Sequence, residues 1–171
     1  MVNQKNIRMK TLYVVRHAKS SWSNKSLADV DRPLKGRGVN DAYGTSQWLV
    51  DNNAVPDLLI SSPATRALHT AMIFARTFDI DFSAIQIDGK LYEGNAKNYR
   101  HCVNQISDDY ASAMIFGHNP SIGAFINSFA DKDIAHVPTT GIACITFDLT
   151  RWKDIDKEGK LIFFDYPKRR H

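Results

Sequence analysis

Two arginines and two histidines in this sequence are placed where they could together bind and attack an anion. They are Arg16, His17, Arg66 and His118, and each follows closely after a run of apolar, β-favouring residues. Two arginines can bind a tetrahedral dianion bidentately and stabilise charge on its oxygens during transfer. A neutral imidazole is a competent nucleophile near neutral pH, and a second imidazole, if protonated, would add a charged donor. These residue types predict transfer of a phosphoryl group.

Such a transfer also needs an acid to protonate the leaving group. Glu93 is the candidate, because it follows another segment that we expect to be extended. A solvated loop carboxylate is the alternative interpretation of Glu93. The remaining histidines show no pair with the spacing of metal ligands; they are His69, His101, His136 and His171.

Strand and helix patterns alternate along the chain, and this alternation must position the four side chains. Apolar runs and helical periodicity distinguish the two kinds of element. The expected strands are residues 12–16, 57–62, 85–91, 113–116, 142–149 and 161–166, and the expected helices are 38–51, 65–78, 97–106 and 120–129.

The alternation predicts an α/β fold with three α/β/α layers, in which helices cover both faces of a mostly parallel sheet. A charged turn joins the last two strands and is typical of a hairpin, which would add an antiparallel strand at the sheet edge. Because the carboxyl ends of parallel strands meet at one edge, residues far apart in sequence converge there.

The turns after two strands also favour an anion. Asn119 followed by Pro120 is the pattern of a helix N-cap and first helical residue, and Arg66 falls in the first turn of its helix. Helix N-termini offer free N–H groups and a partial positive charge, which suits phosphate. We therefore expect an anion pocket at this edge.

The length of 171 residues fits one domain. We expect the domain to span residues 9–167, with 1–8 as a flexible N-terminal extension and 168–171 as a basic tail. No run is apolar enough to span a membrane or to form a signal peptide. Cys102 and Cys144 lie in apolar settings, which indicates free thiols, and we expect a cytoplasmic location.

The net charge of +4 would suit an anionic substrate. Basic residues are scattered and are not interleaved with aromatic ones in the manner of a single-strand binding platform. The sequence therefore argues against a nucleic-acid partner and against a membrane partner.

Four motifs, in order, resemble the histidine phosphatase superfamily, whose fold is phosphoglycerate-mutase-like. They are Arg16-His17-Ala18, Ser61-Ser62-Pro63 with Arg66, Leu91-Tyr92-Glu93, and Gly117-His118-Asn119-Pro120. Within that superfamily the chain is similar to the small SixA-type phosphohistidine phosphatases. That likeness is carried by residues 16–22 and by Asp31-Arg32-Pro33-Leu34 with Arg37-Gly38.

The resemblance implies a role for each matching residue. His17 would be the nucleophile that becomes phosphorylated, and Arg16, Arg66 and His118 would bind the phosphoryl group. Glu93 would act as general acid and then as general base. The resemblance implies no metal and no organic cofactor.

One departure from the family concerns a phosphate contact. Ser23 stands where many mutase relatives carry a phosphate-binding asparagine, and Ser20, Ser23 or Asn24 could supply that contact instead. Lys19 could steer anions or be a plain exposed lysine. Trp22 could line the mouth of the pocket or pack the loop.

The resemblance implies a phosphatase whose substrate is phosphohistidine on a protein, with a covalent intermediate at His17. Little sequence separates Glu93 from the next helix, where larger relatives place lids, so the pocket would be open. A phosphatase of a small phosphorylated metabolite and a non-catalytic phosphate-binding module are the alternatives. A phosphomutase is disfavoured because it needs a closed site. The expected partners are a phosphorylated protein or small molecule, and phosphate, sulfate or a similar anion in the pocket.

Overall fold

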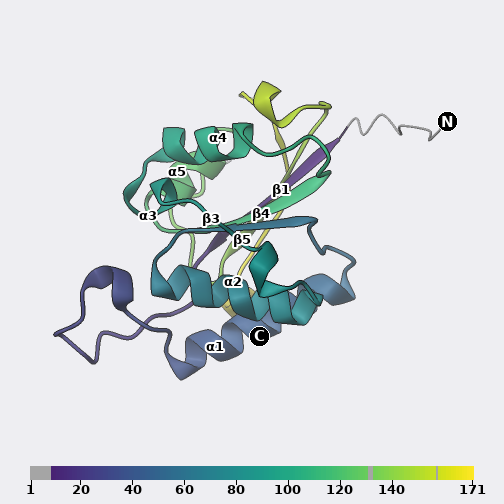
Figure 1. Cartoon of the computed structure of the whole chain (residues 1–171). Helices are drawn as coiled ribbons and strands as arrows, with labels where there is room; N and C mark the ends of the chain where they lie inside the picture. Colours follow the sequence, from purple (N-terminus) through teal and green to yellow (C-terminus); the bar gives the residue numbers. More distant parts are fainter. Residues whose placement is uncertain (1–8, 131–132, 157) are drawn as a thin grey trace.

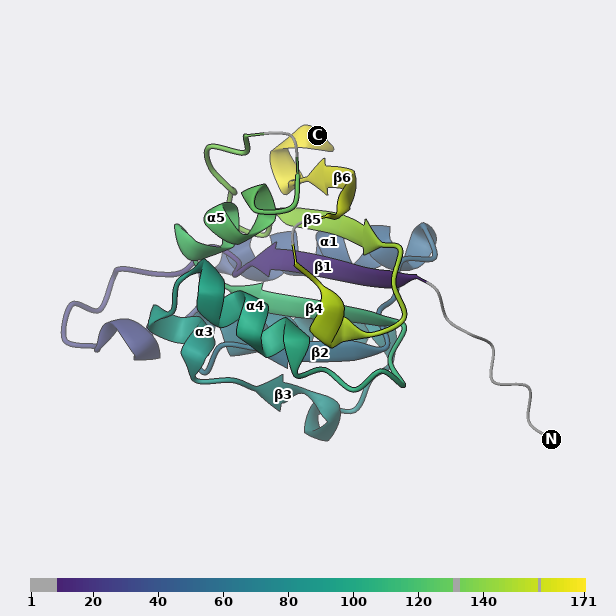
Figure 2. The ribbon, with the colours of Figure 1, turned by 90° about the horizontal axis from the view of Figure 1, so that it is seen from above.

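A computed structural model describes residues 9–130, 133–156 and 158–171, so the expected extension at 1–8 lies outside the described residues (Figure 1). Six strands form one sheet in the order β3-β2-β4-β1-β5-β6, which Figure 2 shows from above. The strands are β1 (Lys10–Arg16), β2 (Leu58–Ser61), β3 (Gln86–Ile87), β4 (Ser112–Gly117), β5 (Ile142–Phe147) and β6 (Lys160–Asp165).

The pairing of the strands confirms the predicted α/β fold with a mostly parallel sheet. β1, β2, β3 and β4 run parallel, whereas β5 pairs antiparallel with both β1 and β6. The last two strands therefore form the expected antiparallel pair, with β6 at the edge. Arg16 lies opposite Gly117, and Ser61 lies opposite Phe116, so β1, β2 and β4 end at the same edge of the sheet.

Helices cover both faces of this sheet, with α1 and α2 on one side and α3, α4 and α5 on the other (Figure 1). This gives the three layers that the sequence predicts. The helices are α1 (Gly36–Asp51), α2 (Thr65–Phe78), α3 (Lys90–Glu93), α4 (Ala96–Asn104) and α5 (Ser121–Asn127).

The central strand β1 packs both layers because its side chains alternate between the two faces. Leu12 and Val14 belong to the core shared with α4 and α5, whereas Tyr13 and Val15 belong to the core shared with α1 and α2. All four are buried. An uninterrupted apolar run is what a parallel strand covered on both faces requires. Arg16 and His17 follow where this buried run ends.

Residues 85–91 are not one extended segment, contrary to the sequence prediction. Only Gln86–Ile87 form a strand, and the chain then turns into the short helix α3. The carboxylate of Asp88 accepts the backbone N–H of Lys90 at 2.9 Å, and its carbonyl accepts the N–H of Leu91 at 3.1 Å. These local bonds start a helical turn in place of a strand.

The expected N-cap at Asn119 is also wrong. Helix α5 begins at Ser121 and is preceded by a cis Asn119–Pro120 peptide bond. The side-chain amide of Asn119 donates to the carbonyl oxygen of Val137 at 2.8 Å, so it ties two loops together and caps no helix.

Two further features bear on the sequence expectations. Cys102 and Cys144 are buried in the cores on opposite faces of the sheet. In the basic segment 168–171, Arg170 is ion-paired to Asp165 at 2.9 Å and donates to Thr45 of α1, so this residue is docked on the protein.

None of the helices in the described residues has the length and apolar character needed to cross a membrane.

Candidate active site

The four residues selected from the sequence lie at the shared edge of the sheet. Arg16 ends β1, His17 follows it, His118 follows β4, and Arg66 lies in the first turn of α2. The His17 and His118 rings have centroids 5.1 Å apart, and Nε of Arg66 lies 3.3 Å from Nε2 of His17. His17, Arg66 and His118 are each at most 7% exposed. These four residues are referred to below as the strand-end cluster.

The imidazole of His17 is held in one orientation. Its Nδ1 lies 2.7 Å from the carbonyl oxygen of Ala18. Because a carbonyl only accepts, Nδ1 carries the hydrogen, and Nε2 keeps the lone pair that faces the N–H of Arg66. The backbone N–H of His17 donates to Gly117, and that of Ala18 donates to the hydroxyl of Thr70, both at 3.0 Å. The unprotonated nitrogen therefore faces the cation.

Burial keeps both histidines neutral near pH 7. It lowers the pKa of His17 from 6.5 to about 3, against the opposing effect of the Ala18 carbonyl, and the nearby charge of Arg66 lowers it further. The pKa of His118 is lowered to about 4, again mainly by burial and then by Arg66. Without a bound anion, His118 is therefore not the charged donor that the sequence left open. A dianion in the cluster would favour its protonation.

His118 is positioned by its own set of hydrogen bonds. Its Nε2 lies 2.7 Å from the hydroxyl oxygen of Ser62, and its backbone N–H donates to the hydroxyl oxygen of Tyr99 at 3.0 Å. Tyr99 in turn donates to the carbonyl of Leu91 at 3.0 Å. Gly117 is required here, because a Cβ at that position would overlap the Tyr99 hydroxyl. Nδ1 of His118 is buried without a partner in the described part of the chain.

An unpredicted carboxylate, Asp29, holds the far edge of Arg66. Nη1 of Arg66 donates to the carbonyl of Asp29 at 2.7 Å, and Nη2 donates to its carboxylate at 3.0 Å. A guanidinium has two bidentate edges. The terminal edge is occupied by Asp29, and the Nε edge remains toward His17. Asp29 lies in the 3-10 helix Asp29–Asp31, a part of the chain where the sequence offered no periodicity.

The same carboxylate collects two more donors. Tyr92 donates its hydroxyl proton to Asp29 at 2.6 Å, and Nε of Arg32 donates at 3.0 Å. These bonds, with that from Arg66, hold the pKa of the Asp29 carboxyl well below its usual range, the Tyr92 bond having the largest effect. The Asp29 carboxylate is therefore ionised near neutral pH, and its bonds to Arg66 orient that guanidinium.

Arg32 braces the loop that carries Asp29. Its side chain is buried, Nη1 donates to Ser20 at 2.7 Å, and its guanidinium lies 3.5 Å from the ring centroid of Trp22. Trp22 is 68% exposed and covers this cation. The Asp31-Arg32-Pro33-Leu34 motif thus supplies the residue that fixes the loop.

No hydrogen bond joins Ser23 to the strand-end cluster within the described residues. Its hydroxyl pairs with that of Ser21 at 2.8 Å and it is exposed. The hydroxyl of Ser20 is bound by Arg32, and the side chain of Asn24 accepts from Ser26 at 2.6 Å. A phosphate contact from this loop stays a prediction.

Glu93 ends α3 and is exposed, and no side-chain hydrogen bond or ion pair of Glu93 is found within the described residues. Its neighbour Tyr92 faces the cluster instead, with its ring 5.6 Å from that of His118. The acid role of Glu93 stays a prediction.

The sequence of this chain is similar to a known protein family. The sequence model described as "Histidine phosphatase superfamily (branch 1)" matches residues 12–120. The uncharacterized protein Rv1276c of Mycobacterium tuberculosis is 30% identical over 165 residues, which is 90% of this chain and 100% of the relative.

Solved structures share the fold. A crystal structure of SixA from Agrobacterium tumefaciens is 27% identical, with a TM-score of 0.78 over 92% of this chain and 98% of the other. The protein histidine phosphatase SixA complexed with tungstate is 18% identical, with a TM-score of 0.81 over 94% of this chain and 99% of the other.

Proposed function

The chain belongs to the histidine phosphatase superfamily and is of the SixA type, and we propose that it dephosphorylates phosphohistidine on a protein through a covalent intermediate at His17. The observation that carries the proposal is the buried, neutral Nε2 of His17, which faces Arg66 at 3.3 Å. A neutral imidazole nitrogen beside a guanidinium suits attack on the electrophilic phosphorus of a phosphoryl group, because the guanidinium can stabilise the negative charge on the phosphoryl oxygens.

In the first step, the Nε2 lone pair of His17 attacks the phosphorus atom. The Nε2–P bond forms while the P–N bond of the substrate breaks, and that electron pair leaves with the substrate imidazole. An imidazole that is protonated at its other ring nitrogen leaves as the neutral species, and one that lacks this proton takes it from the general acid. Arg16, Arg66 and His118 stabilise the charge on the three equatorial oxygens. The Ala18 carbonyl, 2.7 Å from Nδ1, accepts a stronger hydrogen bond as the His17 ring becomes positive.

In the second step, water attacks the phosphorus atom and the Nε2–P bond breaks. One water proton passes to a base, phosphate leaves, and Nε2 of His17 recovers its lone pair. The resemblance assigns the acid and base roles to Glu93. A phosphorylated imidazole that is already protonated is a good leaving group, so an exposed acid is tolerable for this substrate. In this proposal the guanidinium groups of Arg16 and Arg66 neutralise the charge on the phosphoryl oxygens, so the mechanism uses no metal ion.

Two arguments support a protein substrate over a small metabolite. The first is the likeness in sequence as well as fold to SixA from Agrobacterium tumefaciens, which is described as a phosphohistidine phosphatase and is 27% identical over 92% of this chain. The short segment between Glu93 and α4 leaves no room for an inserted lid, and an open site admits a phosphorylated side chain of another protein.

The test measures phosphate release from a phosphohistidine protein in the presence of a chelator, beside sugar and nucleotide phosphates. We expect the phosphohistidine protein to be hydrolysed with the highest kcat/KM. His17→Ala should abolish turnover while circular dichroism shows an intact fold, and the exposed His101→Ala is the matched control. Undiminished turnover in His17→Ala would exclude this nucleophile, and a preference for a metabolite would exclude the proposed substrate.

A further inference from the structure

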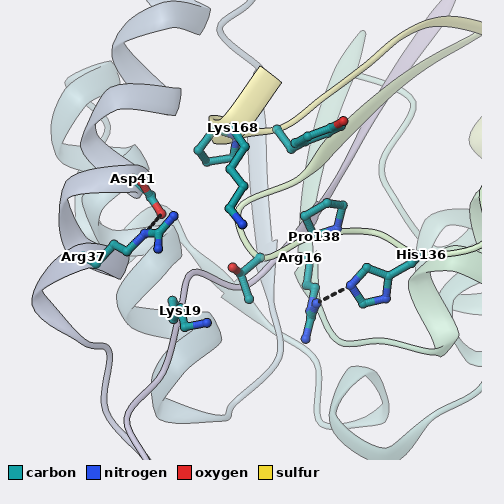
Figure 3. A pocket seen from close by; sticks show the side chains of 10 residues that line it. Arg16, Lys19, Arg37, Asp41, His136, Pro138 and Lys168 are labelled. Atoms are coloured by element: carbon teal, nitrogen blue, oxygen red, sulfur yellow. Dashed lines mark hydrogen bonds and ion pairs between the residues drawn. The ribbon is translucent and has the colours of Figure 1, made fainter. Parts of the chain in front are cut away.

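A cationic groove opens beside the strand-end cluster. It has a volume of about 460 Å³ and is lined by Arg16, Lys19, Arg37 and Lys168, among others (Figure 3). Pockets that bind ligands commonly measure roughly 300–1,000 Å³. Arg16 belongs to both the cluster and the groove, so the groove lies next to the place proposed for the phosphoryl group.

The charge of the groove is unbalanced. Its four cations face a single carboxylate in the lining, Asp41, which lies 3.8 Å from Nε of Arg37. Across the described ranges, no side-chain hydrogen bond or ion pair engages the ammonium groups of Lys19 and Lys168, which are exposed. Figure 3 shows both groups pointing into the same space, which Arg16 also borders. The groove therefore presents an excess of positive charge to an incoming ligand.

Ordered backbone segments fix the positions of the Cα atoms of these two lysines. The carbonyl of Lys19 packs so closely on Gly38 of α1 that a Cβ there would overlap it. Lys168 lies in the 3-10 helix Pro167–Arg169, and Arg170 anchors this turn through its ion pair with Asp165. The two lysines are thus brought together from the two ends of the chain by ordered segments.

We propose that this groove binds an acidic side chain, aspartate or glutamate, of the protein that carries the phosphohistidine. The proposal rests on the proposed function and names the substrate feature that the site selects. Lysine ammonium groups are point charges on flexible stems and suit carboxylates of variable geometry. Pro138 and Tyr166 add apolar walls to the groove, which suit a polypeptide.

The experiment compares two phosphohistidine peptides of equal length whose flanking residues are either glutamate or glutamine. We expect kcat/KM to favour the acidic peptide by about 3- to 10-fold at low ionic strength, the size expected for two exposed ion pairs. The ratio should fall toward 1 as salt screens the charges. Lys19→Gln combined with Lys168→Gln should bring the ratio toward 1 at low salt.

Lys97→Gln is the matched control, because Lys97 is exposed on α4, on the opposite face of the sheet from α1. It should leave the ratio unchanged. Equal rates on both peptides, or an unchanged ratio in the Lys19/Lys168 double variant, would overturn this inference and leave the proposed function standing. Hydrolysis of neither peptide, with activity retained on a small bisphosphate, would overturn the proposed function and this inference with it.

Discussion

Acidification from pH 7 to pH 5 should destabilise this protein because two buried histidines stay neutral in the folded state. Burial lowers the pKa of His17 from 6.5 to about 3 and that of His118 to about 4. As pH falls through 6.5 the unfolded chain binds protons at both rings, whereas the folded protein binds them only near pH 4 and 3. Stability is therefore full above pH 6.5 and is lost as pH falls toward the folded-state values.

The magnitude depends almost entirely on the unfolded state. Integrating the proton difference from pH 7 to pH 5 gives a loss of about 2 kcal/mol for each ring and about 4 kcal/mol for both. The pKa values of the two histidines in the folded state matter little, because both lie below pH 5, the lower end of the range. His17 and His118 are 6% and 7% exposed, so solvent screening does not reduce the effect. The Asp29 carboxyl, whose pKa is held below 3.8, adds to the acid loss only below about pH 5.

The assay is urea unfolding followed by tryptophan fluorescence at pH 5, 6 and 7. The buffers contain chloride and neither phosphate nor sulfate, because a bound dianion would favour protonation of His118. His118→Asn should reduce the difference in unfolding free energy between pH 7 and 5 by about 2 kcal/mol. His101→Asn, at an exposed position, is the control. Equal pH dependence in wild type and His118→Asn would refute the reasoning, as would imidazole NMR signals of His17 that titrate near pH 6.5.

Two further substitutions test the supports of the strand-end cluster. Asp29→Asn should lower kcat/KM by about 10-fold, because it weakens the contact that orients Arg66. This magnitude is the low end for a lost hydrogen bond to a charged group, and we choose it because the Asp29 side chain is 48% exposed. Unchanged kinetics would contradict an orienting role for Asp29. Gly117→Ala should cost about 1–3 kcal/mol of stability, because the added Cβ displaces the Tyr99 hydroxyl that receives the His118 N–H. Thermal unfolding measures this cost, and an unaltered Tm would contradict the close packing.

The convergence of the strand-end cluster could be predicted because it follows from topology. Parallel strands end at one edge, and the ladder places Arg16 opposite Gly117, next to His118. An apolar run that ends in charged residues marks such an edge without knowledge of any tertiary contact. The same signal located Arg66 after the second strand.

Asp29 could not be predicted, because it lies in a loop whose path depends on contacts made elsewhere. One clue was present in Arg32, which the motif Asp31-Arg32-Pro33-Leu34 singled out and which binds Asp29 at 3.0 Å. For α3, a helix of four residues gives no periodicity from which to decide whether Tyr92 or Glu93 faces the cluster. The capping expectation at Asn119 failed because its partner, Val137, lies 18 residues further along the chain.

The central position of β1 sets when the site can form during protein synthesis. β1 is made first, yet it lies between β4 and β5, and the N–H of Arg16 is bound by the carbonyl of Gly141 at 3.0 Å. About 130 residues separate β1 from the end of β5, which takes roughly 7 to 26 s at the usual rates of translation. Until β4 has been made both edges of β1 lack their partner strands, and until β5 has been made one edge still does, while its apolar faces lack part of their cover. His17, the proposed nucleophile, therefore follows the first strand of this sheet to be translated, yet it is set in place only after β5 has been made.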